Sequence, residues 1–309
     1  MKKQNAEVQE NVYKGPNLGQ KIWASRSSYL FLAPFLLAFV IFTVIPILAS
    51  MVLSFTDFNS VSVPNFIGVE NYVRMFLDDD IFMISVKNTL VFAFITGPVA
   101  YLSAIIIAWL VNELGRTART LLTIMFYAPS LAGSAIFIWT YIFSGDAYGL
   151  LNSTLMSLGI LDDPINWLIN ENYNKTVVII VQLWLSLGSG FLALIAGLQT
   201  VNTSMYEAGA IDGIRNRFQE LWFLTLPSIK PQLMFGAVMQ IASSFSLGSV
   251  AASLTGFPST NYSTHTVVLH ITDTGSTKME MGYACAMATV LFLFMILLRN
   301  VIALLLNQD

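Results

Sequence analysis

The chain has 309 residues, of which 55% are hydrophobic and only 11% are charged, and its formal net charge is −3. Soluble globular proteins average about 25% charged residues, so this composition excludes an ordinary soluble domain. The charge balance gives no basic field that would attract nucleic acid, and the single cysteine, Cys285, has no partner for a disulfide within the chain.

Apolar residues are gathered in blocks. Residues 1–28 are mostly polar, and six blocks follow that each reach the roughly 20 residues a bilayer-crossing helix needs. The blocks are Tyr29–Phe55, Asn88–Val111, Thr120–Phe143, Val177–Gln199, Leu233–Leu254 and Met281–Leu306. The first block is too long for the core of a cleavable signal peptide, so we expect it to remain as a span. Because an open strand would leave its backbone unpaired in lipid, we predict an all-α integral membrane protein with one six-span domain over residues 29–309.

Lys and Arg are distributed unevenly between the two sides of this arrangement. Eleven of the fifteen fall on one side, and the other four are Arg74, Lys87, Lys175 and Lys278. Positive residues accumulate on the cytoplasmic side of membrane proteins. Both termini and the segment between the fourth and fifth blocks, residues 204–231, are therefore predicted to be cytoplasmic, and the acidic loops around residues 78–80 and 162–163 to face outward.

Segment 204–231 is charged and punctuated by glycine. Ser204 and Glu207 have the spacing of a capping box, which predicts a short helix from Met205. Gly213 is the kind of residue that ends a helix in the left-handed conformation. We therefore predict a first short helix that stops near Gly213.

Asn216 and Gln219 have the same capping spacing and predict a second short helix, which Pro227 closes. This helix places a set of apolar side chains near water: Phe218, Leu221, Trp222, Phe223 and Leu224. A solvated loop with incidental caps is one interpretation. Exposed apolar residues with a charged rim favour the other, a surface that docks on a second protein.

The same segment resembles the E-A-A-x-x-x-G … I-x-L-P signature of permease subunits of bacterial ABC importers. Here it is read as Glu207-Ala208-Gly209, Asp212-Gly213 and, later, Leu226-Pro227. Gly209 stands where the signature has its second alanine, and one extra residue precedes Leu224. The stretches YLFLAPFLLAFVIFTVIPILASMVLSFTDFN, FIGVENYVRMF, NTLVFAF, YGLLNSTLMSLGI and INW resemble the maltose-type, first-permease group of carbohydrate importers.

The resemblance implies that this segment couples the chain to a cytoplasmic ATPase dimer. The residues implied are Glu207, Ala208, Gly209, Asp212, Gly213, Leu226 and Pro227. It also implies a second related permease, an extracytoplasmic sugar-binding protein that could meet residues 146–174 around Trp167, and a place in the bacterial cytoplasmic membrane with lipid around the spans. ATP and Mg would be used by the ATPase. This chain has no Gly-Lys pair, hence no P-loop, and we expect neither enzymatic activity nor a cofactor in it.

Polar side chains follow one helical face in two of the blocks. The fourth block carries Gln182, Leu185, Ser186 and Ser189, and the fifth carries Gln240, Ser243, Ser244 and Leu247. This spacing of i, i+3, i+4 and i+7 keeps the side chains on one face. Amides and hydroxyls suit a sugar, whereas serines also let membrane helices pack closely. The resemblance favours substrate contact, so we predict a substrate site of Gln182, Ser186, Ser189, Gln240, Ser243 and Ser244. Gly188 and Gly190 are expected to mark a kink or close packing.

The predicted function is uptake of a sugar, an oligosaccharide in particular, and alternatives remain. One is an ABC permease for another polar solute, such as a glycerophosphodiester or a peptide. An ion-coupled carrier is disfavoured because no carboxylate or lysine lies near the middle of any block, although carbonyls and hydroxyls alone can bind sodium. A scaffold without cargo would leave the polar faces without a purpose. His265 and His270 lie five residues apart with no H-E-x-x-H motif, so no metal site is predicted.

Overall fold

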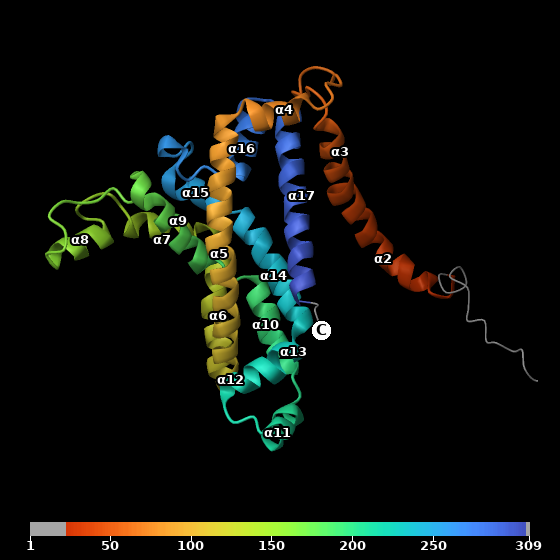
Figure 1. Ribbon diagram of the computed structural model, residues 1–309, viewed down its shortest axis with the longest axis vertical. Coiled ribbons are helices and arrows are strands. Elements are labelled where there is room, and N and C mark those ends of the chain that lie inside the picture. The colour runs from red at the N-terminus through yellow and green to blue at the C-terminus, as the bar shows by residue number, and fades with distance from the viewer. Residues whose placement is uncertain (1–22, 307–309) are drawn as a thin grey trace, which may run out of the picture. The chain divides into compact units, whose positions relative to one another are not determined.

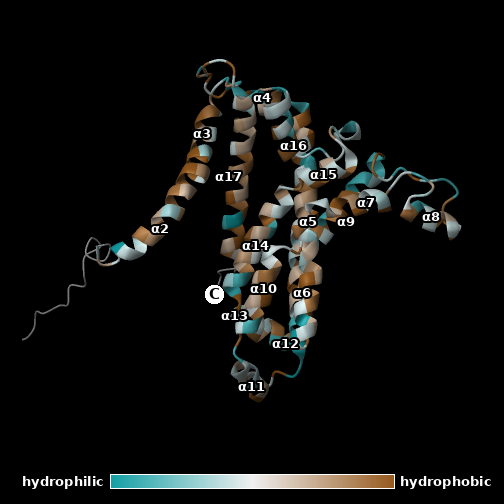
Figure 2. Ribbon diagram, turned by 180° about the vertical axis from the view of Figure 1, so that it is seen from behind, coloured by the Kyte–Doolittle hydropathy of each residue, from teal (hydrophilic) through white to brown (hydrophobic). Residues whose placement is uncertain are grey.

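The computed structural model describes residues 23–306, and its regular elements there are helices, with one isolated bridge between Thr56 and Phe66. The chain forms two compact units, Met1–Val52 and Leu53–Asp309. Most of the predicted N-terminal segment, and the last three residues, lie outside the described residues. Hydrophilic residues gather near the loops and helix ends, notably around α12 and the start of α6 (Figure 2).

The described part of the first unit is a long apolar helix that runs on to Leu53. It consists of α2 (Arg26–Phe39), a π-helical turn η1 (Val40–Val44) and α3 (Ile45–Leu53). The widened turn comes just before Pro46, whose ring would otherwise meet the carbonyl four residues earlier. This run of 28 residues is long and apolar enough to cross a membrane, in agreement with the first predicted block.

The second unit is a helical bundle (Figure 1). Its centre is formed by α5 (Asp80–Asn112), α10 (Ser189–Thr200) and α14 (Lys230–Phe245), which pack on one another. The remaining helices are α4 (Glu70–Leu77), α6 (Arg116–Leu131), α7 (Ile136–Ile142), α8 (Leu150–Ser157), α9 (Glu171–Leu185), α11 (Thr203–Ile211), α12 (Arg217–Glu220), α13 (Leu226–Ser228), α15 (Gly248–Thr255), α16 (Val267–Thr272) and α17 (Met281–Leu306). We refer to the end of this bundle at which α4 and α16 lie as the α4 end, and to the opposite end, at which α11 and α12 lie, as the α11 end (Figure 1).

The third predicted span, Thr120–Phe143, is broken in the structure. Helix α6 stops at Leu131, Ala132 leaves the helical region with φ −90° and ψ 88°, and the chain restarts through η2 (Gly133–Ala135) into α7. The two halves are bent by 81°. Pro129 lacks the N–H that would pair with the carbonyl one turn earlier, which weakens the helix just before the break. Within residues 23–306, five helices are therefore long and apolar enough to cross a membrane, or up to six if the bent pair is counted as one span.

Two other predicted spans also contain breaks, although each remains one candidate span. Helices α9 and α10 are separated at Leu187 and Gly188, and α14 and α15 at Ser246 and Leu247. Gly188 takes φ −99° and ψ −143° as the N-terminal cap of α10. The expectation that Gly188 marks a kink is thus confirmed, and the break places polar residues at the middle of the bundle.

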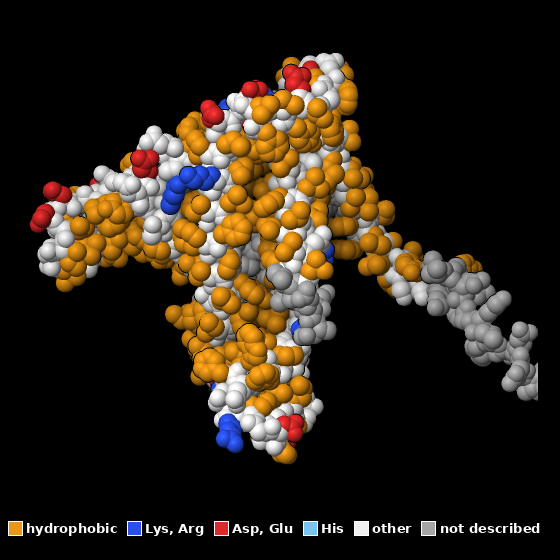
Figure 3. All heavy atoms as spheres, viewed as in Figure 1, with side chains coloured by type: hydrophobic (Ala, Val, Ile, Leu, Met, Phe, Trp, Pro, Cys, Tyr) orange, Lys and Arg blue, Asp and Glu red, His pale blue; other side chains and the backbone are white. Residues whose placement is uncertain are grey.

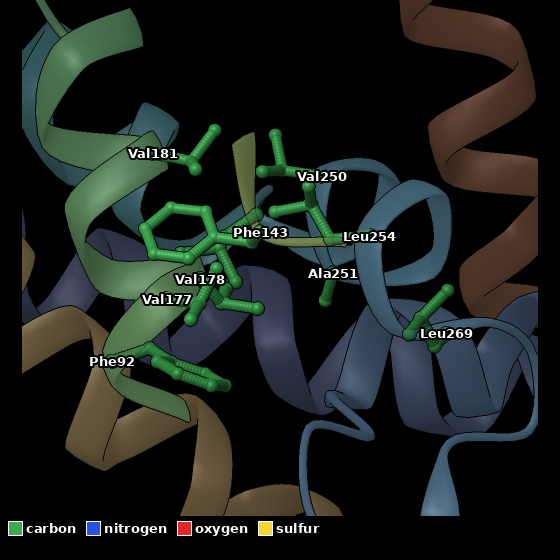
Figure 4. Packing of buried hydrophobic residues seen from close by; sticks show 10 residues of the cluster. Phe92, Phe143, Val177, Val178, Val181, Val250, Ala251, Leu254 and Leu269 are labelled. Carbon is green, nitrogen blue, oxygen red and sulfur yellow. The ribbon is translucent and has the colours of Figure 1, made fainter. Parts of the chain in front are cut away.

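Apolar packing holds the bundle together at several levels. Figure 4 shows one cluster, in which Phe143 lies among Val177, Val178 and Val181 of α9, with Val250 of α15 beside them. Many large side chains on the outside of the bundle remain exposed, and Figure 3 shows them as a nearly continuous apolar surface. Since lipid tails are as apolar as these side chains, close van der Waals packing rather than transfer from water distinguishes the inside from the outside.

Charged residues are concentrated at the ends of the second unit. Figure 3 shows Asp and Glu side chains along the α4 end and on the arm that carries α8, with Lys and Arg near the α11 end. The arm, residues 144–167, is held together by Asn152, which is fully buried. Its amide group donates to the carbonyls of Ser144, Asp146 and Ile165, and its oxygen accepts from the indole of Trp167 at 2.8 Å.

Candidate functional site

Two neighbouring cavities lie where the helices break. The first, about 240 Å³, is bounded by α5, α6, α9, α10 and α14, and the second, about 280 Å³, by α6, α7, α9, α14 and α15. Ser130, Leu185 and Ser243 line both. None of the residues that line either cavity is charged. The cavities therefore offer hydroxyls, amides and backbone groups rather than a charge.

The break between α9 and α10 forms one wall of the first cavity. Ser186, Gly188, Ser189 and Gly190 all line it. Ser186 donates its hydroxyl to the carbonyl of Leu183 at 2.6 Å. A helix start leaves its first N–H groups without intrahelical acceptors, so the beginning of α10 adds backbone donors to the serine hydroxyls on this wall.

Two glutamines supply the amides. Gln182 is buried, lines the second cavity, and its Nε2 donates to the hydroxyl of Ser243 at 3.1 Å, which joins α9 to α14. Gln240 lines the first cavity, and its Nε2 is buried without an acceptor among the described residues. Leaving a buried amide donor unpaired costs about 1–3 kcal/mol. A ligand oxygen or a water that accepts from Gln240 would therefore stabilise the protein.

Five of the six predicted substrate residues thus line these two cavities, and Ser244 does not. Ser244 is buried, donates to the carbonyl of Gln240 at 2.8 Å, and faces Gly97 of α5 in a groove between α5, α14 and α17. Sequence reasoning missed Tyr101, Ser130, Ser246 and Ser249, which the structure adds to the lining. The signal for Tyr101 and Ser130 would have been a polar side chain inside a largely apolar block.

The second candidate region is segment 204–231 at the α11 end. Its first helix, α11, is capped by Asn202, whose side chain accepts the N–H of Ser204 at 3.1 Å. The predicted cap at Ser204 is therefore wrong by two residues, since Asn is at least as good a cap as Ser and lies further upstream. The predicted end near Gly213 is correct: α11 ends at Ile211, and Gly213 has φ +97°.

The second helix of the segment begins as predicted. Asn216 accepts the N–H of Gln219 at 2.9 Å, and the Gln219 side chain accepts the N–H of Arg215 at 2.8 Å. The predicted end of this helix at Pro227 differs from the structure. Helix α12 continues through a π-helical turn η3 (Leu221–Thr225) into α13, which ends at Ser228. Pro227 sits at the start of α13, where a missing N–H costs little.

The two short helices pack on each other at Gly209. A Cβ on Gly209 would lie 2.7 Å from Cδ1 of Leu224 and 3.1 Å from Cδ1 of Ile214. The hydroxyls of Tyr206 and Thr225 are 3.0 Å apart. Glycine at this position therefore allows a close approach. By contrast Glu207, Ala208 and Asp212 are exposed, as are the large side chains of Trp222 and Phe223.

A buried polar network lies at the α4 end. His270 Nε2 is 2.9 Å from Asp79 Oδ2, and the hydroxyl of Tyr283 donates to the same oxygen at 2.7 Å. His265 Nε2 is 3.4 Å from His270 Nδ1. Burial, together with the neighbouring His270, lowers the pKa of His265 to about 4. Burial acts to raise the pKa of Asp79, but hydrogen bonds from His270, the Phe82 N–H and Tyr283 hold it below its ordinary value.

This network joins α5 to α16 and α17, since Asp79 caps α5. Among the residues that the structure describes, no three His, Cys, Asp or Glu side chains are grouped to hold a metal ion. The hydrogen bonds of Asp79 with His270 and Tyr283 tie the ends of these helices together at the α4 end.

Comparison with known proteins assigns the chain to a family. Residues 97–309 match the model described as "Binding-protein-dependent transport system inner membrane component". The match includes the second half of α5, both cavities and segment 204–231. The chain belongs to this family of ABC transporter permeases. These permeases are membrane subunits without catalytic activity of their own.

Two relatives align with this permease over most of its length. The "Probable ABC transporter permease protein YesP" of Bacillus subtilis (strain 168) is 33% identical over 269 residues, which cover 86% of this chain and 85% of the relative. The "Arabinooligosaccharides transport system permease protein AraP" of the same organism is 30% identical over 278 residues, 89% and 87% of the two chains.

A solved structure has the same fold as this permease. It is a chain of a bacterial ABC transporter involved in the import of the acidic polysaccharide alginate, with a TM-score of 0.74 and 21% identity over 95% of this permease and 100% of that chain. At this identity the likeness concerns the fold alone. The fold of this chain is therefore one that a chain of a solved ABC transporter also has.

Proposed function

We propose that this permease carries a neutral oligosaccharide across the bacterial cytoplasmic membrane as part of an ATP-driven importer. The observation that carries the proposal is the pair of uncharged cavities at the helix breaks, with the unpaired amide of Gln240 on the wall of the first. A sugar offers many hydroxyls that both donate and accept, which suits amides and serine hydroxyls. Names of relatives such as the arabinooligosaccharide permease support a carbohydrate.

The substrate site in this proposal consists of Gln182, Ser186, Ser189, Gln240 and Ser243, with Ser130 and Tyr101 added. Ser244 would not contact the sugar and would instead hold α14 against α5. In the same proposal the bent pair α6–α7 counts as one of six spans, and both termini and segment 204–231 are cytoplasmic. The α4 end then faces outward.

The rest of the importer supplies what this chain lacks. A second, related permease would complete the pathway, and a cytoplasmic ATPase dimer would bind ATP and Mg. Segment 204–231 would couple to the ATPase through Glu207, Ala208, Gly209, Asp212, Gly213, Leu226 and Pro227. An extracytoplasmic binding protein would deliver the sugar to the α4 end, where the α8 arm and Trp167 offer a surface.

A permease for a glycerophosphodiester is the second candidate. A phosphate would favour Lys or Arg beside it, and no such residue lines either cavity. An ion-coupled carrier would work without the ATPase. The glycerophosphodiester permease and the ion-coupled carrier are therefore both tested by the same transport assay.

The test is ATP-dependent uptake of a panel of labelled oligosaccharides and one glycerophosphodiester into vesicles that hold the full importer. The wild-type complex is compared with Glu207→Lys, Gly213→Asp and Gln240→Leu. We expect one neutral sugar to enter with ATP, the first two changes to abolish uptake, and Gln240→Leu to weaken it. Uptake that needs no ATP would overturn the proposal in favour of a carrier, and exclusive uptake of the phosphodiester would overturn the cargo. Loss of uptake in Trp167→Ala, with normal assembly, would support docking at the arm, and normal uptake would refute it.

A further inference from the structure

Segment 204–231 has a contact with α5 that involves none of the seven predicted coupling residues. Near the α11 end, α5 carries Trp109 in its last turn and is followed by its C-cap residue Glu113, four residues later and so on the same face. The rings of Trp109 and Phe218 lie 5.6 Å apart between centroids, at 56° to each other. Arg217 Nη2 lies 3.5 Å from Glu113 Oε2. The start of the second short helix is therefore held against the end of α5 by two adjacent side chains.

Arg217 is fixed by more than one partner. Its Nη1 also pairs with Glu220 Oε2 at 2.7 Å, one turn along the same short helix. Glu220 therefore aims the guanidinium at α5 from within the segment. The ion pair with Glu113 is partly exposed and weak by itself. The neighbouring aromatic pair does not depend on charge and adds a contact of defined geometry.

A different face of the same stretch of α5 is packed into the bundle. Ala108 and Val111 are buried in a cluster that includes Ile229, the residue at which the second short helix gives way to α14. The second short helix thus contacts the end of α5 at its beginning, through Phe218 and Arg217, and finishes at Ile229 in the cluster that also buries Ala108 and Val111. A displacement of this helix would therefore act on the end of α5.

Helix α5 leads from this contact to the first cavity. Tyr101 lies about two turns from Trp109 along the helix and lines that cavity. Its hydroxyl donates to the carbonyl of Leu233 on α14 at 3.1 Å. A movement of the α11 end of α5 therefore reaches a wall of the cavity directly, and α14 through this bond.

We propose that Trp109 and Glu113 are positioning residues for energy coupling, which transmit the movement of segment 204–231 through α5 to the cavity. This inference rests on the proposed function, in which the segment follows the ATPase. The exposed residues of the signature would meet the ATPase, whereas Trp109 and Glu113 contact Phe218 and Arg217 of the segment. They act through α5 and touch neither the cargo nor the ATPase.

The experiment measures ATP hydrolysed per sugar imported, in vesicles that hold the full importer and its binding protein. The variants are Trp109→Ala, Trp109→Phe, Glu113→Lys and, as a control, Leu110→Ala, which removes an exposed side chain from an adjacent position on α5. We expect Trp109→Ala and Glu113→Lys to raise this ratio by roughly twofold to thirtyfold, the range for residues on a coupling network. Trp109→Phe keeps an aromatic contact and should stay near wild type, as should Leu110→Ala.

A merely structural contact would lower the amount or thermal stability of the complex and leave the ratio unchanged. That result for Trp109→Ala and Glu113→Lys, with Glu207→Lys still blocking import, overturns the inference and leaves the proposed function intact. If Glu207→Lys imports at the wild-type ratio, the coupling role of the whole segment is lost and this inference with it. A raised ratio in the two variants, with stability at the level of Leu110→Ala, supports it.

Discussion

Gly190 of α10 and Gly236 of α14 face each other where the two helices cross, yet they should respond differently to alanine. A Cβ on Gly190 would lie 3.2 Å from the Cα and 3.4 Å from the carbonyl oxygen of Gly236, both backbone atoms. A Cβ on Gly236 would meet Tyr101 Cε2 at 3.6 Å and the Gly190 oxygen at 3.8 Å, which are ordinary contacts. Only a Cβ added to Gly190 would therefore come closer to the opposite helix than an ordinary van der Waals contact.

The magnitudes follow from these distances. Gly190→Ala must push α10 and α14 apart by a few tenths of an ångström, and overpacking of this kind costs about 1–3 kcal/mol. Gly190 lies at the start of α10, where the gain in helix propensity stays below the roughly 1 kcal/mol of an interior site. Gly236 lies inside α14 and keeps most of that gain. We expect Gly190→Ala to be destabilised by about 1–2 kcal/mol and Gly236→Ala to be neutral or slightly stabilised.

Unfolding of the purified permease in mixed micelles, followed by tryptophan fluorescence, measures both variants. Gly115→Ala is the control, because a Cβ there meets nothing within 4 Å. Uptake by Gly190→Ala should fall as well, since Gly190 lines the first cavity. The reasoning is refuted if Gly190→Ala is as stable as Gly236→Ala, because the crossing would then be looser than the distances say.

Three further changes test other parts of the structure. Gly209→Ala should keep uptake, because the methyl meets the flexible side-chain ends of Leu224 and Ile214 and no backbone atom, whereas Gly209→Leu should overpack the contact by about 1–3 kcal/mol and reduce uptake. Asn152→Ala should loosen residues 144–167, since it leaves several buried partners unpaired at about 1–3 kcal/mol each, and hydrogen exchange should rise there. His265 is neutral when folded, with a pKa near 4 against an ordinary 6.5. The stability it confers is complete above pH 6.5 and declines as the pH falls towards 4, by less than about 2 kcal/mol at pH 5.

Each of these three predictions has a control variant or an outcome that would contradict it. Equal uptake by the Ala and Leu variants of Gly209 would show that the two short helices separate freely. Ser153→Ala, beside Asn152 but only partly buried and bonded only within α8, should leave exchange in the arm unchanged. His265→Phe keeps the stacking on Phe257 and should flatten the melting temperature between pH 7 and 5. If the slope persists in that variant, another group is responsible, and His270, Asp79, Asp273 and Lys278 are the neighbours to examine.

The sequence predicted those features that depend on local or averaged signals. Apolar blocks located the long helices because crossing a bilayer needs length and hydropathy. The cap at Asn216 was found because its partner Gln219 is three residues away. Gly188 and Gly190 were assigned to a kink or close packing, and the structure places one at a break and the other at a helix crossing.

Features that depend on which neighbour a side chain meets could not be predicted. Ser243 and Ser244 are adjacent and share the periodic pattern, yet one reaches a cavity and the other faces Gly97. Helical spacing alone does not tell where one packed face ends and the next begins. The sharp bend at Ala132 was missed because a hydropathy window averages across it. Tyr101 was missed because a single polar residue has no period to detect.

The length of α5 has a mechanical consequence. With 33 residues it extends about 50 Å at 1.5 Å per residue, well beyond the roughly 30 Å of a bilayer core. An α-helix is stiff along its axis. A displacement of one end along that axis therefore displaces the other end, unless the helix bends in between. Its one proline, Pro98, removes a hydrogen bond from the ladder at mid-length and supplies a natural place for bending. Tyr101 follows less than one turn later, so bending of the helix at Pro98 would move a wall of the first cavity.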